Sequence, residues 1–99
     1  MVANPRGDSE RSLMRALFVG GMVDNSELDL EGREPPTHYP ENTGTGRPRY
    51  QLHHVGRNDG DIAYAVYAAP GLADAEVRRI SSERDYARRF DATPAAPST

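Results

Sequence analysis

The chain contains no cysteine. A disulfide framework and a zinc site built on thiolates are therefore both excluded. The sequence also lacks any apolar run close to the roughly 18 residues that a membrane-spanning helix needs, and its polar first residues contain no apolar signal region. We therefore expect a cytoplasmic protein that makes no contact with a membrane.

Lysine is absent too, and all twelve basic residues are arginine. Together with abundant alanine, glycine and proline, this composition is typical of a GC-rich bacterial genome and does not by itself indicate a selected chemistry. The formal net charge of −3 argues against general nucleic-acid binding, because such binding needs a basic surface.

The length of 99 residues leaves room for one domain. Residues 1–11 and 91–99 are polar, rich in proline, alanine or serine, and without periodicity, so both are predicted to be disordered tails. Residues 12–90 are predicted to form a single domain that contains a long loop, 22–47.

The loop 22–47 has no sustained period and contains several prolines and glycines. Loops of this length inside compact domains are uncommon, and they tend to be functional or disordered. Leu28 and Leu30 alternate with acidic residues, which permits one short edge strand within the loop.

Leu13–Val19 is a short apolar run that ends at Gly20-Gly21. Its length and its closing glycines predict a strand, and its contiguous apolar residues predict that both faces are covered, as in a central strand. A nucleotide-binding loop is not indicated, because the further glycine and the following helix that hold a phosphate are missing.

Arg49–Ala69 is predicted to form a β-hairpin, because turn residues separate two segments of alternating polarity. A three-residue loop, Asn58–Gly60, would pair Arg57 with Asp61 and gather the large residues on one face. A two-residue loop would mix polar and apolar residues, so the pattern favours the three-residue loop with Gly60 in a left-handed conformation. The face expected to be buried holds Tyr50, Leu52, His54, Ile62, Tyr64 and Val66.

A helix is predicted over Leu72–Glu83, where apolar residues recur at helical spacing. Asp74 and Glu76 fill its first turn, where the helix dipole favours acidic side chains. Beyond this helix two continuations are open: it extends to about residue 89, or Asp85–Phe90 returns as an edge strand. The aromatic residues of that segment favour the strand.

These elements predict an α+β fold, with a small antiparallel sheet of three to four strands that includes the hairpin 49–69. One C-terminal helix packs on the sheet, because an apolar sheet face needs a covering layer.

No pattern predicts a catalytic, cofactor-binding or metal site. His53 and His54 are neighbours on an expected strand, so they would point to opposite faces and could not share an ion, although His38 in the loop could approach either. The serines lack the glycine context of a nucleophile elbow. The acidic stretch Asp24–Glu31 lacks the central glycine and final glutamate of a calcium loop.

Charge is unevenly distributed along the chain. Residues 24–41 hold six acidic residues and one arginine, whereas residues 78–89 hold five arginines and two acidic residues. Segregated charge steers association, so these two segments are predicted to provide an interaction surface. The alternative is that the two segments face each other within the monomer and largely neutralise. The candidate residues are Asp24, Glu27, Asp29, Glu31, Arg78, Arg79, Arg88 and Arg89.

The sequence therefore favours a non-enzymatic protein-interaction module, a regulatory or accessory protein of bacterial origin whose protein partner is unknown. The alternative is arginine-dependent binding of nucleic acid or of a phosphorylated ligand. A small enzyme is the third hypothesis. No cofactor is indicated.

Overall fold

The structure is a computed structural model that describes residues 13–32, 34–39 and 49–96. The predicted tail 1–11 and the last part of the predicted loop, 40–47, lie outside the described residues.

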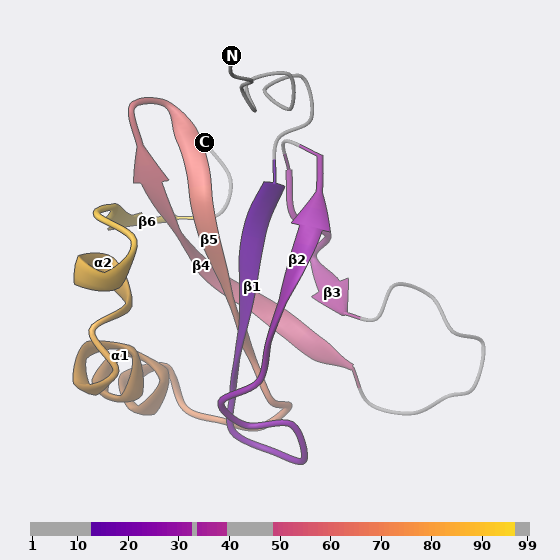
Figure 1. The fold of residues 1–99 in the computed structure, drawn as a ribbon. Coiled ribbons are helices and arrows are strands. Elements are labelled where there is room, and N and C mark those ends of the chain that lie inside the picture. The colour runs from indigo at the N-terminus through magenta and orange to yellow at the C-terminus, as the bar shows by residue number, and fades with distance from the viewer. Residues whose placement is uncertain (1–12, 33, 40–48, 97–99) are drawn as a thin grey trace.

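The described part of the chain is an α+β fold, as predicted, in which one curled sheet carries two helices on one side (Figure 1). The strand order is β2-β1-β5-β4-β3, and β6 also pairs with β4. The elements are β1 (Leu13–Val19), β2 (Glu27–Glu31), β3 (His38–Tyr39), β4 (Tyr50–Asn58), β5 (Asp61–Ala68), α1 (Asp74–Glu83), α2 (Tyr86–Arg89) and β6 (Thr93–Ala95).

The sheet is larger than predicted and it is mixed, so the expected small antiparallel sheet of three to four strands is wrong. β1 runs parallel to β5, with Arg15 opposite Tyr64 and Val19 opposite Ala68, whereas its other neighbour, β2, is antiparallel. The strands β3 and β6 have two and three residues. Strands this short leave no alternating pattern in a sequence, because period-2 alternation needs several residues to become visible.

The first strand, β1, occupies the predicted central position, and its alternating side chains supply two cores. On one side, between the sheet and the helices, lies a helix-side cluster of Leu17, Val19, Tyr64, Val66, Ala68, Val77 and Tyr86. On the other side lies an inner-face cluster of Ala16, Phe18, Val55, Ala65 and Tyr67. Each fully buried large apolar side chain contributes about 1.5–3 kcal/mol of transfer free energy, so β1 anchors both layers.

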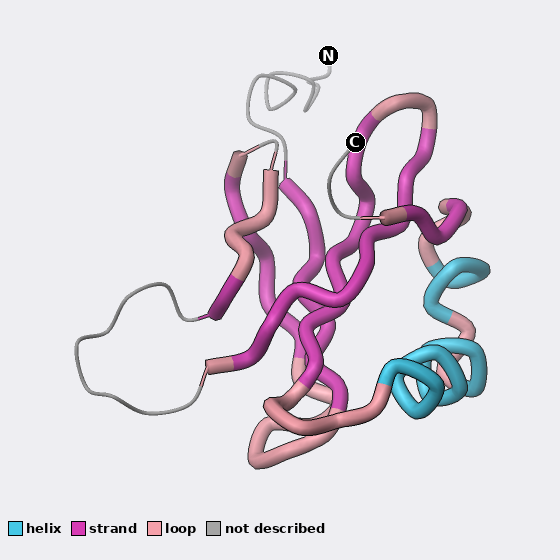
Figure 2. The backbone as a smooth tube through the Cα atoms, turned by 180° about the vertical axis from the view of Figure 1, so that it is seen from behind, coloured by secondary structure: helices cyan, strands magenta, loops and turns pink. Residues whose placement is uncertain are grey.

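The sheet curls around the inner-face cluster, which brings its two edges towards each other (Figures 1 and 2). Leu28 and Leu30 of β2 and Tyr39 of β3 all pack against this cluster. The predicted short edge strand within the loop 22–47 is confirmed as β2. The Tyr67 hydroxyl donates a 2.7 Å hydrogen bond to the carbonyl of Pro36, which ties the segment before β3 to the sheet.

The hairpin β4–β5 forms, but with a two-residue loop, so the predicted three-residue loop is wrong. Asn58 pairs with Asp61, and the loop residues Asp59 and Gly60 both have positive φ, 55° and 86°. Two left-handed residues make a type I′ turn, whose twist matches that of the flanking strands. The prediction that Gly60 is left-handed is confirmed.

Two β-bulges explain why the register argument failed. One lies between Gly56 and Arg57, and its extra residue is Ala63 on β5. The other lies between Leu52 and His54, and its extra residue is His53. Each bulge exchanges the faces of the residues beyond it.

The predicted buried face is accordingly divided between the two cores. Tyr64 and Val66 belong to the helix-side cluster, whereas Tyr50, Leu52 and Ile62 pack against the inner-face cluster. The sequence does not reveal this division, because the bulged residues carry no turn signal of their own.

The helix predicted over residues 72–83 is confirmed as α1, which starts two residues later than expected. The preferred edge strand over Asp85–Phe90 is wrong, because Tyr86–Arg89 is the short helix α2. Asp85 adopts a left-handed conformation with φ 58°, which ends α1 and redirects the chain. Tyr86 then becomes part of the helix-side cluster, and this burial outweighs the strand propensity of the aromatic residues.

The segment 91–99, which the sequence assigns to a disordered tail, contains the strand β6. Thr93, Pro94 and Ala95 pair with Arg57, Gly56 and Val55 in an antiparallel ladder. Proline is tolerated there because β6 lies at the edge of the sheet. Three residues rich in small side chains give no strand signal in the sequence.

Candidate functional site

A cavity of about 630 Å³ lies between the helices and the β4–β5 hairpin. Its volume falls within the roughly 300–1,000 Å³ that is usual for small-molecule sites. The lining residues are His53 and His54 of β4, Tyr64 of β5, Asp74, Arg78, Ser81 and Ser82 of α1, Asp85, Tyr86, Ala87 and Arg88 around α2, and Pro94, Ala95 and Ala96 at β6.

The contribution of α1 follows from its helical period. Asp74, Arg78, Ser81 and Ser82 are separated by four, three and one residues, so they share one face of the helix. Val77, which is fully buried, belongs to the helix-side cluster on the neighbouring face. The amphipathic pattern that packs the helix on the sheet therefore also turns a polar stripe towards the cavity.

The two histidines lie on the same side of β4, so the prediction that they point to opposite faces is wrong. Their Nδ1 atoms are 2.7 Å apart, and their ring centroids are 4.9 Å apart. The cause is the β-bulge at His53, because an extra residue in a strand breaks the alternation of side chains.

Asp74, the first residue of α1, continues this hydrogen-bonded chain. Its Oδ1 atom lies 2.6 Å from Nε2 of His53, and its Oδ2 atom accepts a 2.9 Å bond from Nε of Arg78. The hydrogen bond from His53, followed by the one from Arg78, holds the pKa of Asp74 below its ordinary value. The carboxylate is therefore ionised near neutral pH and can only accept hydrogen bonds.

His54 is held in the neutral form. Its burial, aided by the positive charges of His53 and Arg78 and opposed by that of Asp74, lowers the pKa of His54 to about 4. Its ring meets the ring of Tyr64 edge to face, with centroids 6.3 Å apart. Burial also raises the pKa of Tyr64, so both rings that meet here are uncharged at neutral pH.

The almost fully buried rings of Tyr64 and Tyr86 and the hydroxyl of Ser81 lie in the wall of the cavity, and Phe90 packs behind them. Tyr64 and Tyr86 lie with their ring centroids 6.1 Å apart, and Phe90 packs against Tyr64 at 5.4 Å. Within the described part of the chain, the buried Oγ atom of Ser81 has no hydrogen-bond partner. A buried hydroxyl without a partner costs free energy, and this one is closed off from solvent in the structure.

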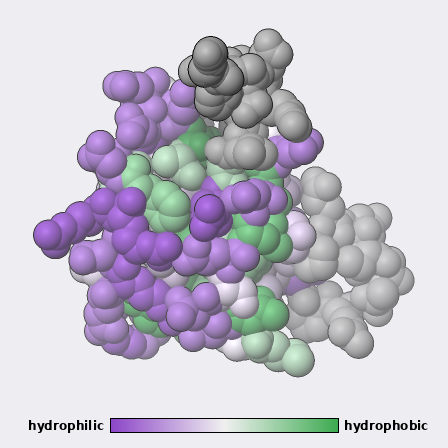
Figure 3. Space-filling model, in the orientation of Figure 1, coloured by the Kyte–Doolittle hydropathy of each residue, from purple (hydrophilic) through white to green (hydrophobic). Residues whose placement is uncertain are grey.

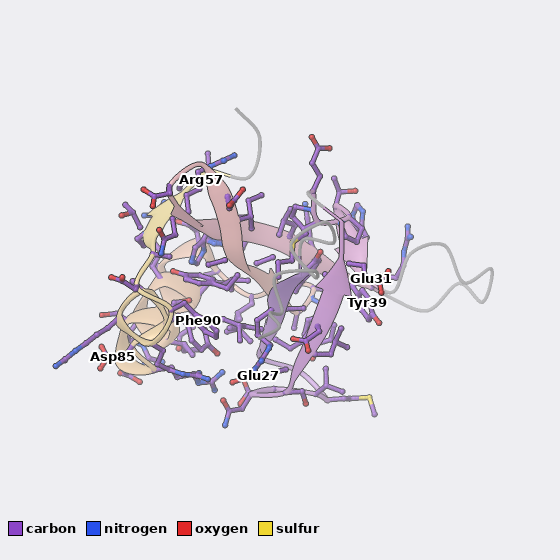
Figure 4. All side chains as sticks on the ribbon, turned by 45° about the horizontal axis from the view of Figure 1, so that its top comes forward. Glu27, Glu31, Tyr39, Arg57, Asp85 and Phe90 are labelled. Atoms are coloured by element: carbon purple, nitrogen blue, oxygen red, sulfur yellow. The ribbon has the colours of Figure 1, made fainter. Side chains whose placement is uncertain are left out.

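The charged side chains of the cavity are matched. Arg78 pairs with Asp74 at 2.9 Å, and Arg88 lies 3.8 Å from Asp85. Figure 4 shows Asp85 on the helix side of the sheet, and Figure 3 shows that hydrophilic residues dominate this side of the surface. The balance of charge fits an uncharged ligand better than a phosphorylated one, which would need unpaired arginines.

The residues predicted from charge segregation meet at one ion pair. Glu27 of β2 pairs with Arg89 of α2 at 3.1 Å, and it also pairs with Arg15 of β1. Asp29 binds the same Arg15. Glu31 lies at the end of β2, on the side of the sheet away from Asp85 (Figure 4).

The other predicted arginines pair within their own helical segment. Arg79 binds Glu76 and Glu83 along α1, and Arg78 and Arg88 pair with the cavity carboxylates described above. Asp24, at the β1–β2 turn, binds an arginine outside the predicted set: Nη2 of Arg84 donates to both of its carboxylate oxygens at 2.9 Å.

Sequence reasoning missed the cavity itself. Of its lining residues, only Arg78 and Arg88 were predicted to belong to a functional surface. The polar stripe on α1 and the adjacent histidines could be recognised in the sequence. The bulge that turns both histidines towards α1 could not. His38 lies on β3, where its Nδ1 atom is 3.2 Å from Oγ1 of the neighbouring Thr37.

No protein-family model, curated protein or solved structure matches the chain. Residues 13–32, 34–39 and 49–96 contain no group of three or more side chains placed to hold a metal ion. None of the helices in these ranges is long and apolar enough to cross a membrane.

Proposed function

We propose that this protein is a non-enzymatic binding module, with a regulatory or accessory role, that holds a small uncharged ligand between its helices and its sheet. The observation that carries the proposal is the 630 Å³ cavity with its tyrosine rings and its fixed network of Asp74, His53 and His54. A cavity with apolar walls and a few oriented polar groups is the usual form of a small-molecule site.

The arrangement of the polar groups supports binding more than catalysis. The carboxylate of Asp74 and both ring nitrogens of His53 are engaged in hydrogen bonds with one another and with their neighbours. Groups held in this way orient a ligand. The matched charges around the rim give no support to the alternative of a phosphorylated ligand.

Titration with a library of small neutral compounds, followed by two-dimensional ¹H–¹⁵N NMR, tests the proposal. We expect hits that shift the amides of β4, α1 and α2 together. Ser82→Trp should fill the cavity and abolish these shifts, whereas Glu83→Trp, at an exposed position on another face of the same helix and outside the cavity lining, should leave them unchanged. Hits that bind the Ser82→Trp variant as well as the wild type would contradict the proposal.

A second candidate function, association with a protein partner, is favoured by the turn between β1 and β2. Met22 and Val23 are 98% and 42% exposed there, and hydrophobic residues gather at the lower end of Figure 3, over this turn. The turn is fixed, because the Tyr50 hydroxyl donates to the carbonyl of Gly20 and accepts from the N–H of Val23. Apolar side chains on a fixed turn are typical of contact surfaces.

The second candidate is tested by affinity purification from the source organism. Partners retained by the wild type and by a Ser82→Trp variant, but lost from Met22→Asp, would support a role of the turn. Equal recovery with Met22→Asp would exclude it. The cytoplasmic location and the bacterial origin remain predictions of the sequence.

A further inference from the structure

The hydrogen-bonded chain from α1 to β4 determines where the histidine protons lie. The ionised Asp74 has no proton to give, so the short contact between its Oδ1 atom and Nε2 of His53, 2.6 Å, requires the hydrogen on the histidine. When His53 is uncharged this is its single ring proton, and its Nδ1 atom then carries a bare lone pair.

The hydrogen bond between the two histidines then determines which nitrogen of His54 carries its proton. The two Nδ1 atoms are 2.7 Å apart, a distance that a hydrogen bond needs and that two bare nitrogens would not keep. With Nδ1 of His53 acting as acceptor, the hydrogen belongs to Nδ1 of His54. An uncharged His54 then has no proton on Nε2.

We infer that Nε2 of His54 is a hydrogen-bond acceptor presented to the cavity, and that it selects uncharged ligands that carry an O–H or N–H group beside an apolar ring or chain. The inference rests on the proposed function, because it specifies which small ligands the cavity takes. His54 lines the cavity, and its Nε2 atom makes no hydrogen bond within the described residues.

The tautomer is tested directly by long-range ¹H–¹⁵N NMR of the imidazole rings at mildly alkaline pH, without any ligand. We expect Nε2 of His54 to resonate as an unprotonated nitrogen and Nδ1 as a protonated one. A protonated Nε2 in the uncharged pair would overturn the inference, whatever the cavity binds.

Selectivity is tested with phenol and anisole, which have the same ring and differ in the O–H donor. We expect phenol to bind the wild type about two to ten times more tightly, the range that one net hydrogen bond provides. His54→Phe should bring the ratio close to one. Asp74→Asn should also reduce it, because an amide can donate as well as accept and no longer fixes the tautomer. Asp61→Asn, at the turn of the hairpin and outside the cavity lining, should leave it unchanged.

The outcomes separate the two proposals. Equal binding of phenol and anisole to the wild-type cavity overturns the inference and leaves the proposed function intact. If neither compound shifts the cavity amides, and no library compound does so, the proposed function fails as well.

Discussion

The ring of Tyr64 lies directly over Gly56 on the neighbouring strand, so that a Cβ atom on Gly56 would lie 2.1 Å from Cε2 of the ring. The glycine is therefore required for space. Its absent side chain lets the tyrosine ring cover the β4 backbone and reach Tyr86 and Phe90.

Gly56→Ala should destabilise the fold by about 1–3 kcal/mol, because the added methyl group must displace a fully buried ring. Chemical denaturation measures this loss. In a Tyr64→Ala background the same substitution should cost clearly less, as a double-mutant cycle would show. Equal costs in the two backgrounds would mean that the overlap is not the cause.

Gly60→Val should destabilise the hairpin by roughly 1 kcal/mol or more, because a β-branched residue tolerates φ 86° poorly. Asp59→Asn is the matched control at the neighbouring left-handed position, and it should be neutral, since asparagine suits the first residue of a type I′ turn. Thermal unfolding of both variants decides the matter; a Gly60→Val protein as stable as the wild type would contradict the observed turn.

Arg84→Gln should cost about 1–3 kcal/mol, because it removes two charge-assisted hydrogen bonds to Asp24 and one to the hydroxyl of Tyr86. Arg88→Gln is the control: its side chain is 84% exposed and its nearest carboxylate oxygen is 3.8 Å away, so its removal should cost only about 0–1 kcal/mol. Unfolding in urea at low and high salt gives both values. Equal losses would argue against a special role of the Asp24–Arg84 pair.

The same comparison bears on the predicted interaction surface, which stays a prediction. Among the residues that the structure describes, Arg78, Arg79 and Arg88 pair only with carboxylates of their own helical segment, so replacing them tests recognition with little effect on stability. Arg89 differs, because its pair with Glu27 joins α2 to β2.

The stability of the protein should fall as the pH is lowered from about 6.5 to about 4. In the unfolded chain His54 titrates near 6.5, whereas in the fold its pKa is about 4. Between these values the unfolded state therefore binds more protons, and stability rises with pH. After allowance for solvent at the half-buried ring, the effect is about 1–2 kcal/mol.

The pH profile of a His54→Phe variant provides the check on this assignment. Its free energy of unfolding should change less between pH 6.5 and pH 4 than that of the wild type. Parallel profiles for the two proteins would assign the acid sensitivity to other groups.

The elements with a strong local pattern could be predicted from the sequence. The apolar run Leu13–Val19 predicts the strand β1, and the helical spacing over residues 72–83 predicts the helix α1. In both segments the order of apolar and polar side chains indicates which faces are buried. The acidic alternation around Leu28 and Leu30 was enough for β2.

What could not be predicted depends on contacts between distant segments. The bulges at His53 and Ala63 arise where β4 and β5 adjust to cores on both faces of the sheet. The short strand β6 exists because β4 offers it an edge, and α2 forms because Tyr86 has a site to fill. The candidate cavity depends on all of these elements. The sequence contains the residues that line it, but it does not show that they lie close together in the fold.

The strand β6 has a consequence for the solubility of the protein. Without it, the backbone N–H and C=O groups of Val55–Arg57 would form an open strand edge, which is a template for pairing with another molecule. β6 blocks this edge, and Pro94, which has no N–H to offer, makes a poor template in its turn. A chain that ends after Ala92 should therefore self-associate at concentrations at which the full chain is monomeric, as measured by light scattering. Equal scattering from the two chains would mean that β6 has no such protective role.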